Sequence, residues 1–197
     1  MIRLIITVVA LTVFCTVYAA AGEEPVFQTT KEEIVKELTR PVSRTRGYIQ
    51  QGQQGKQRNI VVYEKKQTET IEKIVVINNN NNTPRVNLKV EFNFDSYTIR
   101  PESYRLLREL GNALETENIS GSNIAIMGHT DSDGTDQYNL GLSLNRALAV
   151  KQYLIANFSI KPANLRVLGY GEAMPLVFNT TAANKQINRR VEVRVER

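Results

Sequence analysis

The sequence predicts an α/β fold, a two-layer sandwich in which two helices cover one face of a mixed sheet. Apolar and polar residues alternate strictly through residues 86–94, which is typical of a strand with one buried face. Residues 124–127 are continuously apolar, as expected for a central strand with both faces covered. Apolar residues recur at helical spacing in residues 104–114 and 140–154, and two further strands follow near the C-terminus. The resulting order is strand, helix, strand, helix, strand, strand.

Residues 1–21 have the layout of a secretory signal peptide. Arg3 is followed by an apolar run at residues 4–18 and then by three alanines and a polar segment. An uncleaved membrane anchor is the alternative, because about 18 apolar residues are just enough to span a bilayer. A lipid anchor on Cys15 is not expected, because the large Phe14 precedes it where that processing signal needs a small residue. We therefore expect export and cleavage.

Residues 22–84 are expected to form a flexible tether with one short helix and one short strand. The helix is predicted at residues 30–40, where apolar residues form a narrow stripe and Pro41 ends it. The strand is predicted at residues 71–77, a short apolar patch. A run of five asparagines follows this patch and is read as a low-complexity linker. The folded domain is therefore expected in residues 85–197.

Part of the expected tether is basic. Residues 40–58 carry five basic side chains and no acidic one, interleaved with Gln and Gly. Such a composition cannot bury a core, so a solvated segment is expected. The functional alternative is contact with lipid headgroups, with anionic wall polymers or, through the tether as a whole, with envelope proteins.

Composition narrows the chemistry of the chain. With 42% hydrophobic and 23% charged residues, the sequence belongs to the soluble globular class. The formal net charge of +5 is modest and scattered, so no nucleic-acid partner is expected. The single cysteine, Cys15, lies in the signal segment, so the mature chain has no disulfide framework and no thiolate metal site.

Residues 128–154 carry the candidate site. The stretch begins as a strand ends, turns through a loop rich in Asp, Gly and Thr, and enters a long amphipathic helix. Asp131 lies in the loop and Arg146 lies in the helix. A carboxylate and a guanidinium near a strand end and a helix start can receive a ligand that bears both an amine and a carboxylate. A structural ion pair between the two residues is the plain alternative.

This stretch resembles the signature of the OmpA-like peptidoglycan-associating domain. The resemblance covers residues 86–197 and rests on separate motifs in the family order, VEFNFDSYTIRPES, GHTDSDG, GYGEAMP and NRRVEV. It implies the OmpA-like βαβαββ fold and non-covalent binding of peptidoglycan through the diaminopimelate of the stem peptide. It implies no catalytic activity, no cofactor and no metal.

The key Asp and Arg of that family fall on Asp131 and Arg146. The resemblance implies that Asp131 accepts hydrogen bonds from the ligand ammonium and that Arg146 offers two donors to the carboxylate. The wider candidate set comprises Asp95, Thr130, Asn139, Leu142, Ser143 and Arg189. For Asn139 and Ser143, capping or packing is an equal alternative. Arg189 faces either the ligand groove or solvent.

Two other kinds of site are disfavoured. Asp131, Asp133 and Asp136 suggest a calcium loop, but the sixth and twelfth positions hold Asp136 and Leu142 where an EF-hand needs Gly and Glu. The only histidine, His129, has no nucleophile or oxyanion site indicated by the sequence. A structural role at the strand end is expected for it.

The expected function is non-catalytic attachment to the cell wall in a diderm bacterium. The protein would be periplasmic, cell-wall associated or attached to the outer membrane, and would anchor an envelope assembly to peptidoglycan. One alternative is a stator-type motor protein of the same family, which needs a membrane helix with a proton-accepting carboxylate, and residues 2–21 contain none. The other is a wall hydrolase or amidase, or an accessory of one, and one histidine without a mature cysteine argues against catalysis.

Overall fold

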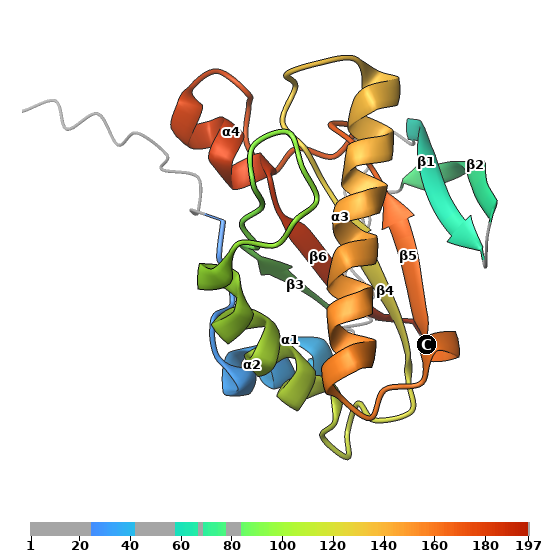
Figure 1. Cartoon of the computed structure of the whole chain (residues 1–197), viewed down its shortest axis with the longest axis vertical. Helices are drawn as coiled ribbons and strands as arrows, with labels where there is room; N and C mark the ends of the chain where they lie inside the picture. The colour runs from blue at the N-terminus through green and yellow to red at the C-terminus, as the bar shows by residue number, and fades with distance from the viewer. Residues whose placement is uncertain (1–24, 42–57, 67–68, 78–83, 197) are drawn as a thin grey trace, which may run out of the picture.

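The computed structural model of the chain describes residues 25–41, 58–66, 69–77 and 84–196 (Figure 1). The predicted signal peptide, the asparagine run and most of the basic stretch lie outside these residues. Within the described ranges, no helix is long and apolar enough to cross a membrane.

The six described strands form one mixed sheet in the order β2-β1-β5-β4-β6-β3. Only β4 and β5 are parallel neighbours, and the other adjacent pairs are antiparallel. The strands are β1 Arg58–Lys66, β2 Glu69–Ile77, β3 Arg85–Leu88, β4 Asn123–Gly128, β5 Leu165–Gly169 and β6 Val191–Glu196.

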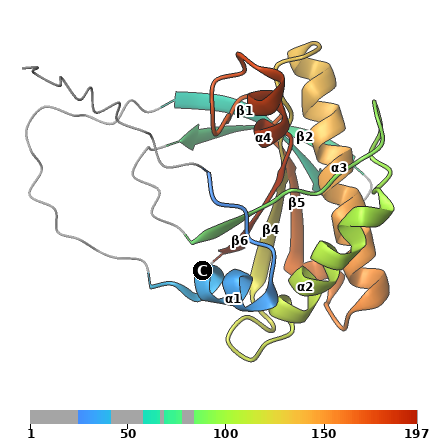
Figure 2. The same ribbon diagram turned by 90° about the vertical axis from the view of Figure 1, so that its left-hand side faces the viewer.

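Two helices cover one face of this sheet, as predicted. They are α2, Tyr104–Leu114, and α3, Asp136–Asn157, and Figure 2 shows both on the same side. Pro101 opens a single 3-10 turn before α2, which suits its fixed φ and missing N–H. The strand and helix order of residues 85–196 follows the prediction, apart from a short additional helix, α4, Ala182–Asn188.

The main core lies between these helices and the sheet. It contains Leu107 and Leu110 from α2, Leu154 from α3, and Ile126 and Val193 from the sheet. A second, smaller cluster lies on the other face and joins Val62, Ala125, Met127, Leu168 and Tyr170. Successive residues of β4 thus enter different clusters, because side chains alternate across a strand. This explains why residues 124–127 are continuously apolar.

The first helix, α1, Lys31–Thr39, is part of the domain, which corrects the prediction of a flexible tether at these residues. Thr30 and Glu33 form a capping box, and Ile34 and Leu38 are buried in the main core beside α2. The backbone N–H of Lys31 also donates to the Glu109 carboxylate at 3.1 Å. The helix itself was predicted, but its docking depends on residues far along the chain.

The hairpin of β1 and β2 is the second correction to the expected tether. A strand was predicted at residues 71–77, and the structure extends it from Glu69 to Ile77. Residues 58–66 were expected to be unstructured, but they pair with both β2 and β5. Val62 is fully buried in the smaller core cluster and anchors this strand to the domain. The composition of the segment did not predict this burial.

The predicted strand at residues 86–94 is shorter than its pattern. β3 ends at Leu88, opposite Val191, where its neighbour β6 begins. Beyond this point the chain turns back, and Asp95 has a φ of 51°. Phe92 forms one isolated bridge with Ile99, whereas Phe94 is 100% exposed. The alternation therefore continues into a loop with which none of the described strands pairs.

Candidate functional site

Two glycines let α3 approach the ends of the central strands. Gly128 ends β4 and lies opposite Gly169, which ends β5. A Cβ on Gly169 would lie 2.6 Å from the Leu140 carbonyl oxygen, and one on Gly128 would collide with the Ser143 carbonyl. Only glycine permits this contact. The approach places the start of α3 directly beside the loop that follows β4.

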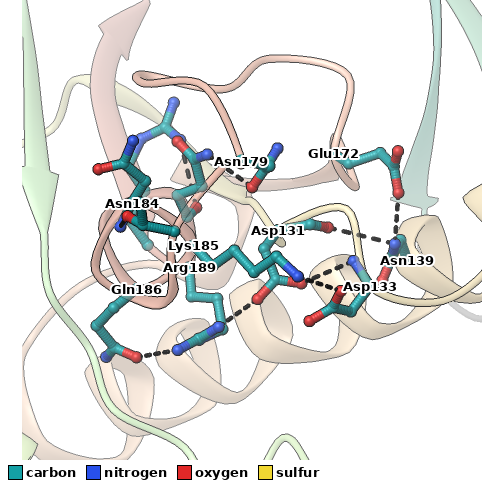
Figure 3. A network of polar contacts seen from close by, with 12 residues as sticks. Asp131, Asp133, Asn139, Glu172, Asn179, Asn184, Lys185, Gln186 and Arg189 are labelled. Atoms are coloured by element: carbon teal, nitrogen blue, oxygen red, sulfur yellow. Dashed lines mark hydrogen bonds and ion pairs between the residues drawn. The ribbon is translucent and has the colours of Figure 1, made fainter.

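Asp131 occupies that loop and is 6% exposed. Its Oδ1 accepts a hydrogen bond from the Asp133 backbone N–H at 3.0 Å, and its Oδ2 is paired with Arg189 Nη1 (Figure 3). Asn139 of α3 donates to the Asp131 backbone carbonyl at 3.3 Å. Contacts from the loop and from the end of α4 thus hold the carboxylate in place, and α3 holds the backbone of Asp131.

Arg146 lies on α3 and is only 8% exposed. Its Nε donates to the Ser96 carbonyl at 3.1 Å, and its guanidinium carbon lies 5.0 Å from the centre of the Phe92 ring. Within the described part of the chain, Nη1 and Nη2 form no hydrogen bond or ion pair. Burial lowers the pKa of Arg146, and Arg189 lowers it further, whereas Asp131 and Asp95 raise it. The guanidinium remains charged and has two nitrogens available.

The loop between β3 and α2 lies across from the Asp131 loop and forms a second wall of the site. The Asn93 N–H donates to the Thr98 carbonyl at 3.0 Å, and the Tyr138 hydroxyl of α3 donates to the Asp95 carboxylate. Together with the Ser96 contact to Arg146, these bonds fix the loop against α3. Phe94 projects from it without burial, so this wall presents an aromatic ring and a carboxylate.

Both walls border one open cavity of about 690 Å³. Seven of the eight candidate residues line it: Asp95, Thr130, Asp131, Asn139, Leu142, Arg146 and Arg189. Ser143 does not. It is fully buried, donates to the Leu140 carbonyl and accepts from the Gly171 N–H, both at 2.9 Å. This geometry matches the packing alternative for Ser143, which ties α3 to the segment after β5.

The chain matches the OmpA family over residues 91–189, half of its length. The chain belongs to the OmpA family. Outer membrane porin F of Pseudomonas fluorescens is 40% identical over 112 residues, which cover 57% of this chain and 33% of the porin. The peptidoglycan-associated lipoprotein of Pseudomonas putida is 35% identical over 103 residues, covering 52% of this chain and 60% of the lipoprotein.

Among solved structures, the peptidoglycan-associated lipoprotein from Burkholderia pseudomallei is 30% identical, with a TM-score of 0.49. The match covers 54% of this chain and 88% of that one. The chain thus matches about a third of the porin and less than two thirds of the Pseudomonas lipoprotein. The OmpA family and these relatives are structural proteins and not enzymes, in agreement with the prediction of a non-catalytic protein.

Asn139 is buried beside the OmpA-family motif loop and serves its geometry. Its side-chain nitrogen donates to the Asp131 carbonyl and, at 2.7 Å, to the Glu172 carboxylate, as Figure 3 shows. Thr135 rather than Asn139 caps α3, because its side chain accepts from the Tyr138 N–H. Asn139 therefore joins three segments around the cavity, the role of a positioning residue.

Two buried residues that line the cavity have polar side-chain atoms without a hydrogen bond to the described part of the chain. His129 and Thr130 are each 3% exposed, and both line the cavity. Among the described residues, both ring nitrogens of His129 and the Thr130 hydroxyl make no hydrogen bond. Burial, then Arg190 and Arg85, lowers the pKa of His129 well below its usual value, so the ring is neutral. These uncharged polar atoms are buried behind the cavity surface, and His129 Nε2 lies 3.8 Å from the Glu192 carboxylate.

The alternative considered from the sequence, a structural ion pair between Asp131 and Arg146, does not form among the described residues, where Asp131 pairs with Arg189. Sequence reasoning placed Arg189 in the candidate set but not this contact. It also missed Tyr138 and Phe94. Tyr138 is near the motif, but only the fold shows that it reaches Asp95, which is 43 residues away.

The acidic residues of the motif loop do not form a metal centre in the described structure. Asp133 pairs with Lys185 at 2.6 Å, and no group of three or more His, Cys, Asp or Glu residues in the described ranges is arranged to hold an ion. The cavity instead combines separated positive and negative groups. This arrangement suits a small zwitterionic ligand.

Proposed function

We propose that the chain binds peptidoglycan non-covalently, with the diaminopimelate of the stem peptide held between Asp131 and Arg146. The observation that carries this proposal is the Arg146 guanidinium. It is buried, it borders an open cavity, and its two terminal nitrogens have no partner among the described residues. A buried charge is costly unless it is paired, so such a group favours a ligand of opposite charge.

Each charged group of the ligand has a place in the cavity. The two free nitrogens of Arg146 can donate in parallel to a carboxylate. Asp131 can accept from an ammonium and keep its bonds to Asp133 and Arg189, because a carboxylate has about four lone-pair sites. Asp95 adds a second negative group on the opposite wall. A ligand with an amine and a carboxylate on one carbon therefore fits better than a simple anion or cation.

The names of relatives support an association with peptidoglycan and the outer membrane. The lipoprotein of Pseudomonas putida is named as peptidoglycan-associated, and the porin of Pseudomonas fluorescens as an outer-membrane protein. The chain would act in the periplasm as a non-catalytic anchor that attaches an outer-membrane or periplasmic assembly to the wall. Residues 22–84 would carry the contacts with envelope proteins. A stator-type motor protein and an accessory of a wall enzyme are the alternative roles for the same domain.

Competition on isolated sacculi tests the proposed ligand. The purified chain is sedimented with sacculi in the presence of free diaminopimelate or of 1,5-diaminopentane. Diaminopimelate should release the chain, whereas 1,5-diaminopentane, which has two amines and no carboxylate for Arg146, should need roughly tenfold higher concentrations or more. Equal competition would contradict the role of Arg146. A chain that never sediments with sacculi would contradict wall binding, and release of wall fragments would identify an enzyme.

A further inference from the structure

The two edges of the sheet differ in whether a further segment of the described chain covers them. At the β3 edge, the Gln28 N–H donates to the Asn87 carbonyl at 3.1 Å, and the Asn87 N–H donates to the Gln28 side chain at 2.9 Å. The segment before α1 therefore occupies the outer side of β3. At the other edge, β2 is the last of the described strands, and Figure 1 shows it outermost.

β2 has the properties of a strand that can accept another strand. It is nine residues long, contains no proline, and pairs along its whole length with β1, and none of the other described strands pairs with its outer side. The outer side of such a strand has a row of unpaired backbone N–H and C=O groups, which favours pairing with a further chain.

The charges on β2 are self-complementary about Ile71. Glu69 and Lys73 lie two residues to either side of it, so all three side chains point to the same face. In an antiparallel pair related by a two-fold axis at Ile71, Glu69 of each copy lies opposite Lys73 of the other. Ile71 then meets its own counterpart. An axis at Glu72 or at Lys73 would instead place like charges opposite each other, which is destabilising.

The side chains concerned are available for this contact. Glu69 is exposed, and the Lys73 side chain is 47% exposed. Lys73 Nζ lies 3.8 Å from Glu64, which Arg166 already binds at 2.6 Å. Glu72 points to the other face, where Tyr63 donates to it at 3.1 Å. A lysine that is weakly held by its own chain can pair with a glutamate of another.

We propose that the chain forms a homodimer through antiparallel pairing of β2 with β2 of a second copy, centred on Ile71. The pairing would extend the sheet across both copies. None of the residues that line the ligand cavity belongs to β1 or β2, so both cavities stay open in the dimer. The proposal does not rest on the identity of the ligand.

Sedimentation equilibrium of the full chain tests the dimer with a charge-swap series. The natural chain should dimerise. Glu69→Lys and Lys73→Glu should each raise the dimer dissociation constant roughly tenfold or more, because each creates two like-charge pairs across the interface. The double variant, Glu69→Lys with Lys73→Glu, restores both opposite pairs and should restore the dimer. Glu72→Lys, on the other face of the same strand, is the matched control and should change the constant less than threefold.

The recovery in the double variant separates a lost interface from a lost fold. A natural chain that is monomeric at a concentration of about 100 μM would overturn the proposal. So would a dimer whose dissociation constant is unchanged in both single variants. A double variant that stays monomeric while its circular dichroism matches the natural chain would exclude this register and thereby the proposed interface.

Discussion

Arg146 and Asp131 are both buried, and contacts within the chain orient both side chains. Arg146 uses Nε for the Ser96 carbonyl and lies over Phe92, which fixes the direction of the guanidinium. Asp131 is fixed by Asp133 and Arg189. The proposed ligand contacts therefore fall on groups that are already oriented, which reduces the entropy lost on binding.

Arg146→Lys should weaken binding of diaminopimelate-containing peptides on the order of thirtyfold, because it keeps the charge but loses the planar pair of donors. Titration calorimetry with a soluble stem peptide measures the change. Arg100→Lys is the matched control. Arg100 also lines the cavity, but it is paired with Glu91 at 3.5 Å and Glu102 at 3.2 Å and is 45% exposed. Equal losses in the two variants would remove the special role of Arg146.

Asp131→Asn should also weaken binding of the stem peptide on the order of thirtyfold, because the side chain keeps its shape and loses the charge that receives the ammonium. Asp133→Asn is the control, since Asp133 is a neighbouring carboxylate that is 68% exposed and pairs with Lys185. It should bind almost normally in the same calorimetric titration. Unchanged binding by Asp131→Asn would return Asp131 to a purely structural role with Arg189.

His129 predicts a dependence of stability on pH. Its folded-state pKa is lowered well below 6.5 by burial and by Arg190 and Arg85, so the unfolded chain binds this proton more readily. The stabilisation is complete above the unfolded pKa of about 6.5 and is lost as the pH falls through and below it. In thermal melts between pH 7.5 and 5, His129→Phe should lose less stability than the natural chain. Because His129 is the only histidine, parallel curves would contradict the prediction.

At the scale of elements, local patterns predicted the strands and helices with a clear apolar periodicity of their own, including β4 and β6, which pair with each other across the sequence. The helical spacing of apolar residues was sufficient to predict α3, and the continuous apolar run was sufficient to predict β4. The pattern at residues 86–94 failed because strand length is set by the neighbour, and β6 begins opposite Leu88. β1 was missed because its anchoring contact, Val62 against Met127 and Leu168, joins segments far apart in the chain.

Leu38→Ala tests whether α1 belongs to the folded domain. Leu38 is 1% exposed in the main core, so its truncation should lower the free energy of unfolding by about 2–5 kcal/mol. Urea denaturation measures this change. Val26→Ala, at a position that is 69% exposed, should have almost no effect. If Leu38→Ala were as stable as Val26→Ala, α1 would be an appendage, and the boundary expected near residue 85 would hold.

At the scale of the whole molecule, the domain is larger than its family motif. The family match begins at residue 91, yet α1 and the β1–β2 hairpin complete the core and the sheet. The sequence placed Asp131 and Arg146 in one site because a single motif contains both. It could not predict that Arg189 would pair with Asp131, because these residues are 58 positions apart and meet only when α4 and β6 are in place.

Two cavities on one dimer would change how the protein holds a polymer. Peptidoglycan repeats its stem peptide, so a dimer can bind two stems at once, and the second contact forms at a high effective concentration. The Glu69→Lys variant should therefore bind a soluble single stem peptide with the same affinity as the natural chain. It should also dissociate from sacculi at least tenfold faster, because it binds one stem at a time. Release from sacculi after dilution into excess free diaminopimelate measures this rate, with Glu72→Lys as the dimeric control. Equal release rates for the three proteins would mean that dimerisation contributes nothing to wall attachment, even if each cavity binds its ligand as proposed.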